Sequence, residues 1–396
     1  MKTISKNTIS LALIITFLFM INSFAAVVIF SVFVLYKKEQ RTYYGLLGIF
    51  FALFVSLINA TKVPVNDLAM YIDYYRLAER MPLHQYVEIL WGKDVLYLGY
   101  TWFVYQIVGN HDKIFVFLMS LTSYLFFLKA LLIGCKSLRL NSSSVYLCLV
   151  FLFFYPFIFS TSAHILRQTI AFSIISYVMA KKIFEGKNLW YIGVVASLFH
   201  GSVAFFIPFL FLKFLYKPFS FKTAPSYIAV VAVLLSVKII AALLGTMGLS
   251  GSVFDFAVRR ASLGTTFEAS LSLGQVAISA LFCALMFFSI YIFKPFLKAE
   301  PSFNFFANMT SLLFLFIIVN SDQGELQVRF NIFFWQLIPL FVCFLSAAYK
   351  GVYSVAKILL SVMVFASWMA YNNFSSPWRY ECGNMFFLYP AIAFFL

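Results

Sequence analysis

Charged residues are scarce in this chain, and acidic residues are the scarcest. Only 11% of its 396 residues are charged, and 14 aspartates and glutamates stand against 29 lysines and arginines. Hydrophobic residues make up 63% of the chain and aromatic residues 20%. Apolar runs near or above the ~20 residues that cross a bilayer recur from end to end, which excludes a soluble globular protein. The sequence predicts an all-α polytopic integral membrane protein, with residues 1–396 forming a single transmembrane domain.

The sequence also lacks the patterns of a metal centre and of a disulfide framework. It has no D-x-D pair, no CxxC motif and no cluster of histidine and aspartate at metal-ligand spacing. Three of its five cysteines lie inside apolar runs, and their spacing suggests no pairing; the five are Cys135, Cys148, Cys283, Cys343 and Cys382. We therefore expect no metal and no other cofactor.

The net charge of +15 reflects basic clusters that are scattered between the apolar runs. They form no aromatic-interleaved basic face, so we expect no nucleic-acid partner. The positive-inside rule explains them as cytoplasmic segments instead. The clusters are Lys37, Lys38 and Arg41; Lys136 and Arg139; Lys181, Lys182 and Lys187; Lys213, Lys217 and Lys222; Lys294 and Lys298; and Lys350.

With these clusters inside, the apolar runs predict about 11–13 membrane-spanning helices. A single crossing between Lys187 and Lys213 would carry Lys213 to the outside, so residues 188–212 are predicted to form a short helical or re-entrant hairpin with Phe199–Ser202 at its outer tip. The other predicted spans are 8–36 (one span or two), 43–60, 113–134, 144–161, 165–184, 224–245, 272–293, 303–320, 328–348, 351–371 and 385–396.

Two longer outer segments follow from the same topology. Residues 61–112 mix charges with tyrosine and tryptophan, as helices at the level of lipid headgroups do, and are predicted to be periplasmic with interfacial helices that include 95–109. Residues 246–271 form a second periplasmic loop. The shorter outer loops are 160–166, 321–327 and 372–384.

Two arginines are predicted at the outer ends of spans. Arg167 and Arg329 both fall in the first turns of helices that run inward, where the helix dipole disfavours a cation but where a phosphate binds well. Around Arg167, His164 shares its helix face, Gln168 follows it, and Ser160, Thr161 and Ser162 are candidate caps. The pattern favours a site for a diphosphate.

Structural explanations of the same residues stay open. Either arginine could anchor to headgroups or pair with an acid such as Glu325. His200 could be a satisfied histidine at a loop tip, and Asp67 with Tyr71 a surface contact. Arg260 lies next to Arg259, which is four residues after Asp255, so an ion pair is the first interpretation and a phosphate site the second.

An ordered set of short motifs resembles a known family. It consists of Asp67 with Tyr71 and Tyr75, Asp94 ahead of an apolar stretch, Ile165–Ala171, Lys181–Lys182, Leu198–Ser202 and, more faintly, Arg329–Asn331. This set resembles the EpsG-type polysaccharide polymerases, which belong with the Wzy-type O-antigen polymerases of Gram-negative bacteria.

The resemblance implies a glycosyltransferase with GT-C-like architecture in the bacterial inner membrane, its active site facing the periplasm. It would polymerise oligosaccharide repeat units carried on undecaprenyl diphosphate, which serve as donor and acceptor, and a chain-length regulator protein is a candidate partner. The diphosphate would bind Arg167, Gln168 and Arg329. His200 and Asp67 are the candidate bases for the acceptor hydroxyl, with His200 slightly favoured, while Tyr71, Asp94, His164 and Arg260 are secondary substrate contacts.

Three other functions compete with polymerisation. A flippase for lipid-linked oligosaccharides would place its arginines in a cavity near the middle of the membrane. An O-antigen ligase would concentrate its site in one long periplasmic loop. A solute transporter would show inverted repeats and interrupted helices in matching halves, which this sequence lacks.

Overall fold

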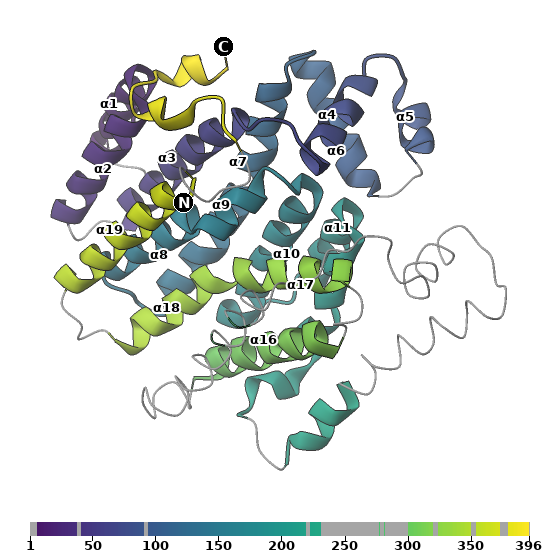
Figure 1. The fold of residues 1–396 in the computed structure, drawn as a ribbon. Coiled ribbons are helices and arrows are strands. Elements are labelled where there is room, and N and C mark those ends of the chain that lie inside the picture. The colour runs from purple at the N-terminus through teal and green to yellow at the C-terminus, as the bar shows by residue number, and fades with distance from the viewer. Residues whose placement is uncertain are drawn as a thin grey trace. The chain divides into compact units, whose positions relative to one another are not determined.

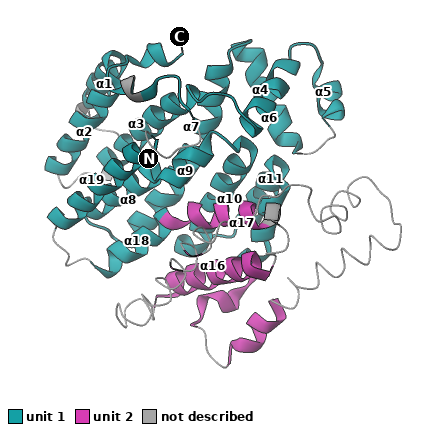
Figure 2. Ribbon diagram, in the orientation of Figure 1, with its two compact units in different colours: residues 1–210, 339–396 teal, residues 211–338 magenta. Residues whose placement is uncertain are grey.

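A computed structural model describes residues 6–37, 41–90, 94–218, 222–230, 277, 281, 300–319, 324–349, 354–372 and 379–395. These residues are built from helices, and their one β feature is an isolated bridge between Lys62 and Tyr380. The chain divides into two compact units, residues 1–210 with 339–396 and residues 211–338 (Figures 1 and 2). The predicted all-α polytopic membrane fold is confirmed.

Several predicted spans appear as long apolar helices. Within the described residues, four helices are long and apolar enough to cross a membrane: 42–60, 112–137, 301–319 and 327–348. A bent pair of helices, 142–154 with 156–162, counts as a fifth. The predicted spans at 224–245 and 272–293 and the loop at 246–271 lie largely or wholly outside the described residues.

The first apolar run is interrupted at Asn22. Helix α1 (Lys6–Ile21) ends there and α2 (Ser23–Lys37) begins. The Asn22 side chain accepts a hydrogen bond from the Ala25 N–H at 2.8 Å and donates one to the Phe387 carbonyl at 2.8 Å. An asparagine that caps the next helix in this way explains why one continuous run forms two helices, which are followed by α3 (Arg41–Ala60).

Residues 61–112 fold into three short helices, α4 (Asp67–Leu77), α5 (Leu83–Ile89) and α6 (Val95–Val108). The three lie together in Figure 1. Side-chain hydrogen bonds to backbone carbonyls join them: the Tyr86 hydroxyl donates to Tyr74 at 2.9 Å and the Trp102 indole to Met81 at 3.0 Å. The helices expected in this segment are therefore present.

Helices α7 (Asp112–Ser137) and α10 (Leu166–Glu185) pack side by side and carry much of the core of the first unit. In the sequence between these two helices, α8 (Ser142–Phe154) and α9 (Pro156–Ser162) meet at a bend of 45°. Proline 156 opens α9 while Tyr155 is extended, because a residue before proline disfavours the helical conformation. This bend brings Ser162 within 2.9 Å of the buried Asn59 amide on α3.

The hairpin expected for residues 188–212 is confirmed. Helix α11 (Trp190–Phe199) is followed by two short 3-10 helices, η1 (Gly201–Phe206) and η2 (Pro208–Phe211), and the chain reverses at His200. The Asn188 side chain reaches the Leu210 carbonyl at 3.4 Å across the two arms. Gly193 permits the close approach, since a Cβ there would lie 3.3 Å from Ile207.

The second unit contains η3 (Lys213–Tyr216), α16 (Pro301–Val319) and α17 (Gly324–Gln336). In the first unit the chain continues with α18 (Ile338–Ala348), α19 (Ser354–Ala370), η5 (Gly383–Phe387) and η6 (Ala391–Phe394). The prediction of one last span at 385–396 is wrong. Pro390 breaks that run into two short turns, because it cannot donate a hydrogen bond within a helix.

Candidate active site

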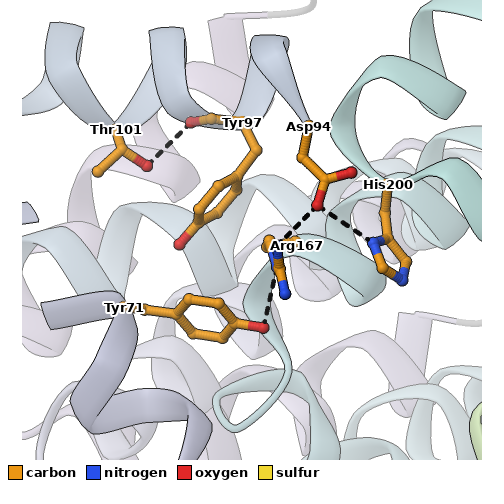
Figure 3. A network of polar contacts seen from close by, with 6 residues as sticks. All are labelled: Tyr71, Asp94, Tyr97, Thr101, Arg167 and His200. Atoms are coloured by element: carbon orange, nitrogen blue, oxygen red, sulfur yellow. Dashed lines mark hydrogen bonds and ion pairs between the residues drawn. The ribbon is translucent and has the colours of Figure 1, made fainter. Parts of the chain in front are cut away.

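Three elements of the first unit bring an acid, a base and an arginine together. One oxygen of Asp94, Oδ2, lies 2.8 Å from Nη1 of Arg167 and 3.4 Å from Nδ1 of His200 (Figure 3). On the other side of Arg167, its Nε donates to the Tyr71 hydroxyl at 3.3 Å. We call these four residues the Asp94 network.

Asp94 immediately precedes α6 in a conformation that few residues tolerate. Its φ of 53° and ψ of 47° are left-handed, which aspartate and asparagine accept more readily than other side-chain-bearing residues. Its side chain caps no N–H of α6 and is directed toward Arg167 and His200 instead. The Asp94 side chain therefore takes part in the network, and the N-terminus of α6 has no side-chain cap.

Arg167 lies in the first turn of α10, as predicted from the sequence. Its guanidinium sits over the Tyr71 ring, 5.4 Å from the ring centre, and the Tyr71 ring packs at 5.6 Å against the fully buried Tyr97. A guanidinium has five N–H donors. The contacts among described residues use the N–H of Nε and one N–H of Nη1. Neither N–H group of Nη2 has an acceptor among the described residues, so both can donate to a bound one.

His200 occupies the turn between the two arms of the hairpin and is 8% exposed. Its extended backbone ends α11 and directs the imidazole toward Asp94 (Figure 3). If Nδ1 carries the proton shared with the carboxylate, Nε2 holds a lone pair, which is the arrangement that lets a histidine accept a proton. A carboxylate beside Nδ1 favours this orientation and this tautomer of the ring.

The pKa of Asp94 is set by opposing effects. Burial pushes the pKa of this carboxyl upward, but the hydrogen bond and charge of His200, the charge of Arg167 and the Gly201 N–H together outweigh burial and hold the pKa below its usual value. Asp94 is therefore ionised at neutral pH and neutralises Arg167.

The other candidate carboxylate, Asp67, lies elsewhere. It is the first residue of α4 and half-buried, and within the described part of the chain its side chain makes no hydrogen bond or ion pair. Tyr71, four residues later, is the residue of that helix face that reaches Arg167. The structure thus places Asp94, which was expected to be a secondary substrate contact, beside His200.

Two details predicted around Arg167 are wrong. Ser160, Thr161 and Ser162 belong to α9 and bond to carbonyls of their own helix, so they do not cap α10. His164 does not share a helix face with Arg167, because the chain turns between α9 and α10. Burial, aided by the charge of Lys62, lowers the pKa of His164 to about 3, so it is neutral. Gln168 is buried in the first turn of α10.

The remaining predicted residues lie outside this unit. Arg329 is half-buried in the second turn of α17, in the second unit. Its action together with Arg167 on one diphosphate stays a prediction. Arg260 lies outside the described residues.

Comparison with known proteins assigns the family. The EpsG family matches residues 45–389, which is nearly the whole chain and includes every residue of the Asp94 network. The chain belongs to the EpsG family. Membership of the EpsG family suggests a polysaccharide polymerase type of function. No curated protein and no solved structure matched the chain, so the GT-C-like architecture stays a prediction.

Tyr97 is the residue near the site that sequence reasoning did not single out. It belongs to residues 95–109, for which the sequence predicts an interfacial helix with aromatic side chains at the level of lipid headgroups. In the structure it is fully buried and supports the Tyr71 ring that Arg167 covers. Its position three residues after Asp94 is the one local signal that could have marked it.

Proposed function

We propose that this EpsG-family protein is a membrane glycosyltransferase that polymerises oligosaccharide repeat units linked to undecaprenyl diphosphate. The observation that carries the proposal is the single oxygen of Asp94 that meets both Arg167 and His200. One carboxylate thereby connects Arg167, which can bind a diphosphate, with His200, which can accept a hydroxyl proton. Both are needed when a lipid diphosphate leaves a sugar that another sugar attacks.

On the donor side, Arg167 receives the diphosphate. Its Nη2 donors match phosphate oxygens, and α10 begins one residue earlier at a terminus where Ile165 provides no side-chain cap. Because Asp94 already balances the arginine charge, the pair recognises the diphosphate through directed hydrogen bonds more than through net charge. Gln168, in the same turn, and Arg329 are proposed as further donors.

On the acceptor side, His200 is the base. A bond forms between the acceptor oxygen and the anomeric carbon of the donor sugar while the bond from that carbon to the diphosphate breaks. The hydroxyl proton passes to Nε2, and the Asp94 carboxylate stabilises the imidazolium that results. Asp67 is retained as a residue that orients the acceptor.

The proposal places the network at the periplasmic face of the bacterial inner membrane. The support is the charge pattern. Basic residues lie at the C-terminal ends of α7 and α10, at Lys136 and at Lys181 with Lys182. Arg167 lies at the opposite, N-terminal end of α10, and Asp94 contacts it there. The lipid-linked substrates of this reaction then reach the site from the outer leaflet.

Deletion of the chain in its host tests the function. A strain that lacks a polymerase should display surface glycan of a single repeat unit, whereas loss of a flippase leaves no glycan. Complementation with the wild-type chain should restore long polymers. Surface glycan of unchanged length after deletion would refute the proposal, and complete absence of glycan would favour the flippase.

A further inference from the structure

Three cysteines that are far apart in the sequence converge inside the first unit. Cys135 on α7, Cys148 on α8 and Cys343 on α18 are all buried, and their sulfur atoms lie within 4.8 Å of one another. The Sγ atoms of Cys135 and Cys343 are 3.7 Å apart. Cys382, the fourth described cysteine, lies apart from the cluster beside Thr61. We call Cys135, Cys148 and Cys343 the thiol cluster.

The spacing of these sulfurs suits a bound ion. Three thiolates at ~2.3 Å from one centre are ~3.8–4.0 Å apart from each other, for tetrahedral and trigonal geometry respectively. The separation of 3.7 Å between Cys135 and Cys343 falls close to this range, whereas a disulfide requires ~2.05 Å and would leave the third thiol without a role. Three sulfurs that meet from three helices form most of a coordination shell.

The surroundings of the cluster supply compensating charge. Lys357 on α19 is buried, donates to the Ser144 hydroxyl at 2.7 Å and lies near Cys148. Ser346, on the same helix as Cys343, lies near Cys148. A buried ammonium is expensive unless negative charge lies near it, and thiolates that bind a cation would provide that charge. Apolar packing alone does not explain a lysine in this position.

Aromatic side chains close the cluster from one side. Phe184 at the end of α10 stacks on Phe344 at 5.3 Å, and a Cβ on Gly134 would lie 3.1 Å from Phe184 and 3.8 Å from the Cys343 sulfur. Phe184 is 17 residues after Arg167 on α10, which is about 25 Å along a helix. The thiol cluster is therefore a separate place from the Asp94 network.

We propose that the thiol cluster binds one soft d10 cation, Cu(I) or Zn(II), and thereby ties α7, α8 and α18 together. Thiolates select these ions over hard cations such as Mg²⁺. Binding converts the three thiols to thiolates and releases their protons to solvent, and Lys357 offsets part of the resulting negative charge. The role is structural, since no group of the Asp94 network belongs to the cluster.

Metal analysis of the full-length chain tests this proposal. The protein would be purified in detergent without a histidine tag and offered Zn(II), or Cu(I) kept reduced by ascorbate. We expect about one ion per chain, with X-ray absorption showing three sulfur ligands at ~2.3 Å. Cys148→Ser should weaken binding by about ten-fold or more, while the matched variant Cys382→Ser, which changes a buried cysteine outside the cluster, should leave it unchanged.

Several outcomes would overturn the proposal. These are no ion bound from either metal, an ion held by nitrogen and oxygen ligands alone, equal binding by Cys148→Ser, or a disulfide between Cys135 and Cys343 in the purified protein. The X-ray absorption measurement needs only the wild-type chain, so the test stands even where Cys148→Ser fails to fold. Because it measures metal and not polymer, its result is independent of the proposed glycosyltransferase activity.

Discussion

His200 Nδ1 lies 3.4 Å from the same oxygen of Asp94 that pairs with Arg167, although 106 residues separate the histidine from the aspartate. A change in the charge of His200 therefore alters the electrostatic interaction between Arg167 and the carboxylate that they share. In the proposed function, an imidazole that gains a proton would compete with the guanidinium for that oxygen and leave more of its N–H groups to an anion. In the proposed reaction, Asp94 would therefore couple proton transfer at His200 to diphosphate binding at Arg167.

Arg167→Lys should cut polymerisation by more than about ten-fold while membrane abundance stays near normal. Lysine keeps the charge but cannot bind Asp94, Tyr71 and a phosphate in the planar pattern of a guanidinium. The matched control is Arg76→Lys, which alters an exposed arginine paired with Asp112 and should change glycan length little. The length of the surface glycan is measured for both variants. Polymer of wild-type length from Arg167→Lys would show that Arg167 only anchors the chain at lipid headgroups.

His200→Gln should abolish polymer formation but permit donor binding, because loss of a general base typically costs ~10²–10⁴ in rate. Asp67→Asn should show a smaller defect. A purified assay with lipid-linked repeat units, run on both variants across pH, makes the comparison. An active His200→Gln with an inactive Asp67→Asn would transfer the role of base to Asp67, and two active variants would remove it from both.

Tyr71→Phe tests the contribution of the Tyr71 hydroxyl to the network. The variant loses the hydroxyl that accepts from Arg167 Nε at 3.3 Å but keeps the ring beneath the guanidinium. We expect a loss of about two- to ten-fold in polymerisation, in line with ~1 kcal/mol for such a hydrogen bond. Tyr71→Leu, which also removes the ring, should lose more activity, and equal activities of the two variants would show that the ring contributes nothing.

The half-buried His164 predicts a pH dependence of stability. Its pKa falls from 6.5 to about 3 on folding, so the unfolded chain binds the extra proton between these values. Stability should decrease as the pH is lowered from about 6.5 toward 3, by at most ~1.4 kcal/mol per pH unit. Thermal unfolding in detergent at several pH values measures this, and His164→Gln should flatten the profile over that interval; an unchanged slope would contradict the assignment.

The hairpin can be placed in the membrane by labelling. Gly201 beside the tip has open space for a side chain, and Lys187 at the other end of the arms is exposed. A cysteine at Gly201 should react with impermeant thiol reagents from the periplasm, and one at Lys187 from the cytoplasm. The four described native cysteines are buried and should give little background. Labelling of both positions from one side would contradict the topology.

The sequence predicted those features that depend on local pattern. The start of α10 at Leu166 and the reversal at His200 follow from an apolar run after polar residues and from the placement of lysines. The prediction of a span at 385–396 failed because Pro390 interrupts residues that are otherwise apolar enough to cross a membrane. Hydropathy counts such a residue but does not weigh its missing N–H.

Long-range pairings were beyond such patterns. Nothing near Asp94 indicates that its partner is His200 and not another basic residue, because the pairing depends on how α6 and the hairpin pack. The thiol cluster is a stronger case, since 208 residues separate Cys135 from Cys343 and neither has a ligand motif beside it. Such convergence exists only once α7, α8 and α18 are assembled.

The bridge between Lys62 and Tyr380 has a consequence for biosynthesis. The backbone N–H of Val63 bonds to Arg379 at 2.8 Å and that of Glu381 to Thr61 at 2.7 Å, so residues 61–63 find their partner only when residues 379–381 have been translated. At ~5–20 residues per second, the ribosome needs on the order of 15–60 s to make the intervening chain. During that interval the Val63 N–H and the Thr61 carbonyl must be satisfied by water or another transient partner, so this part of the fold closes last.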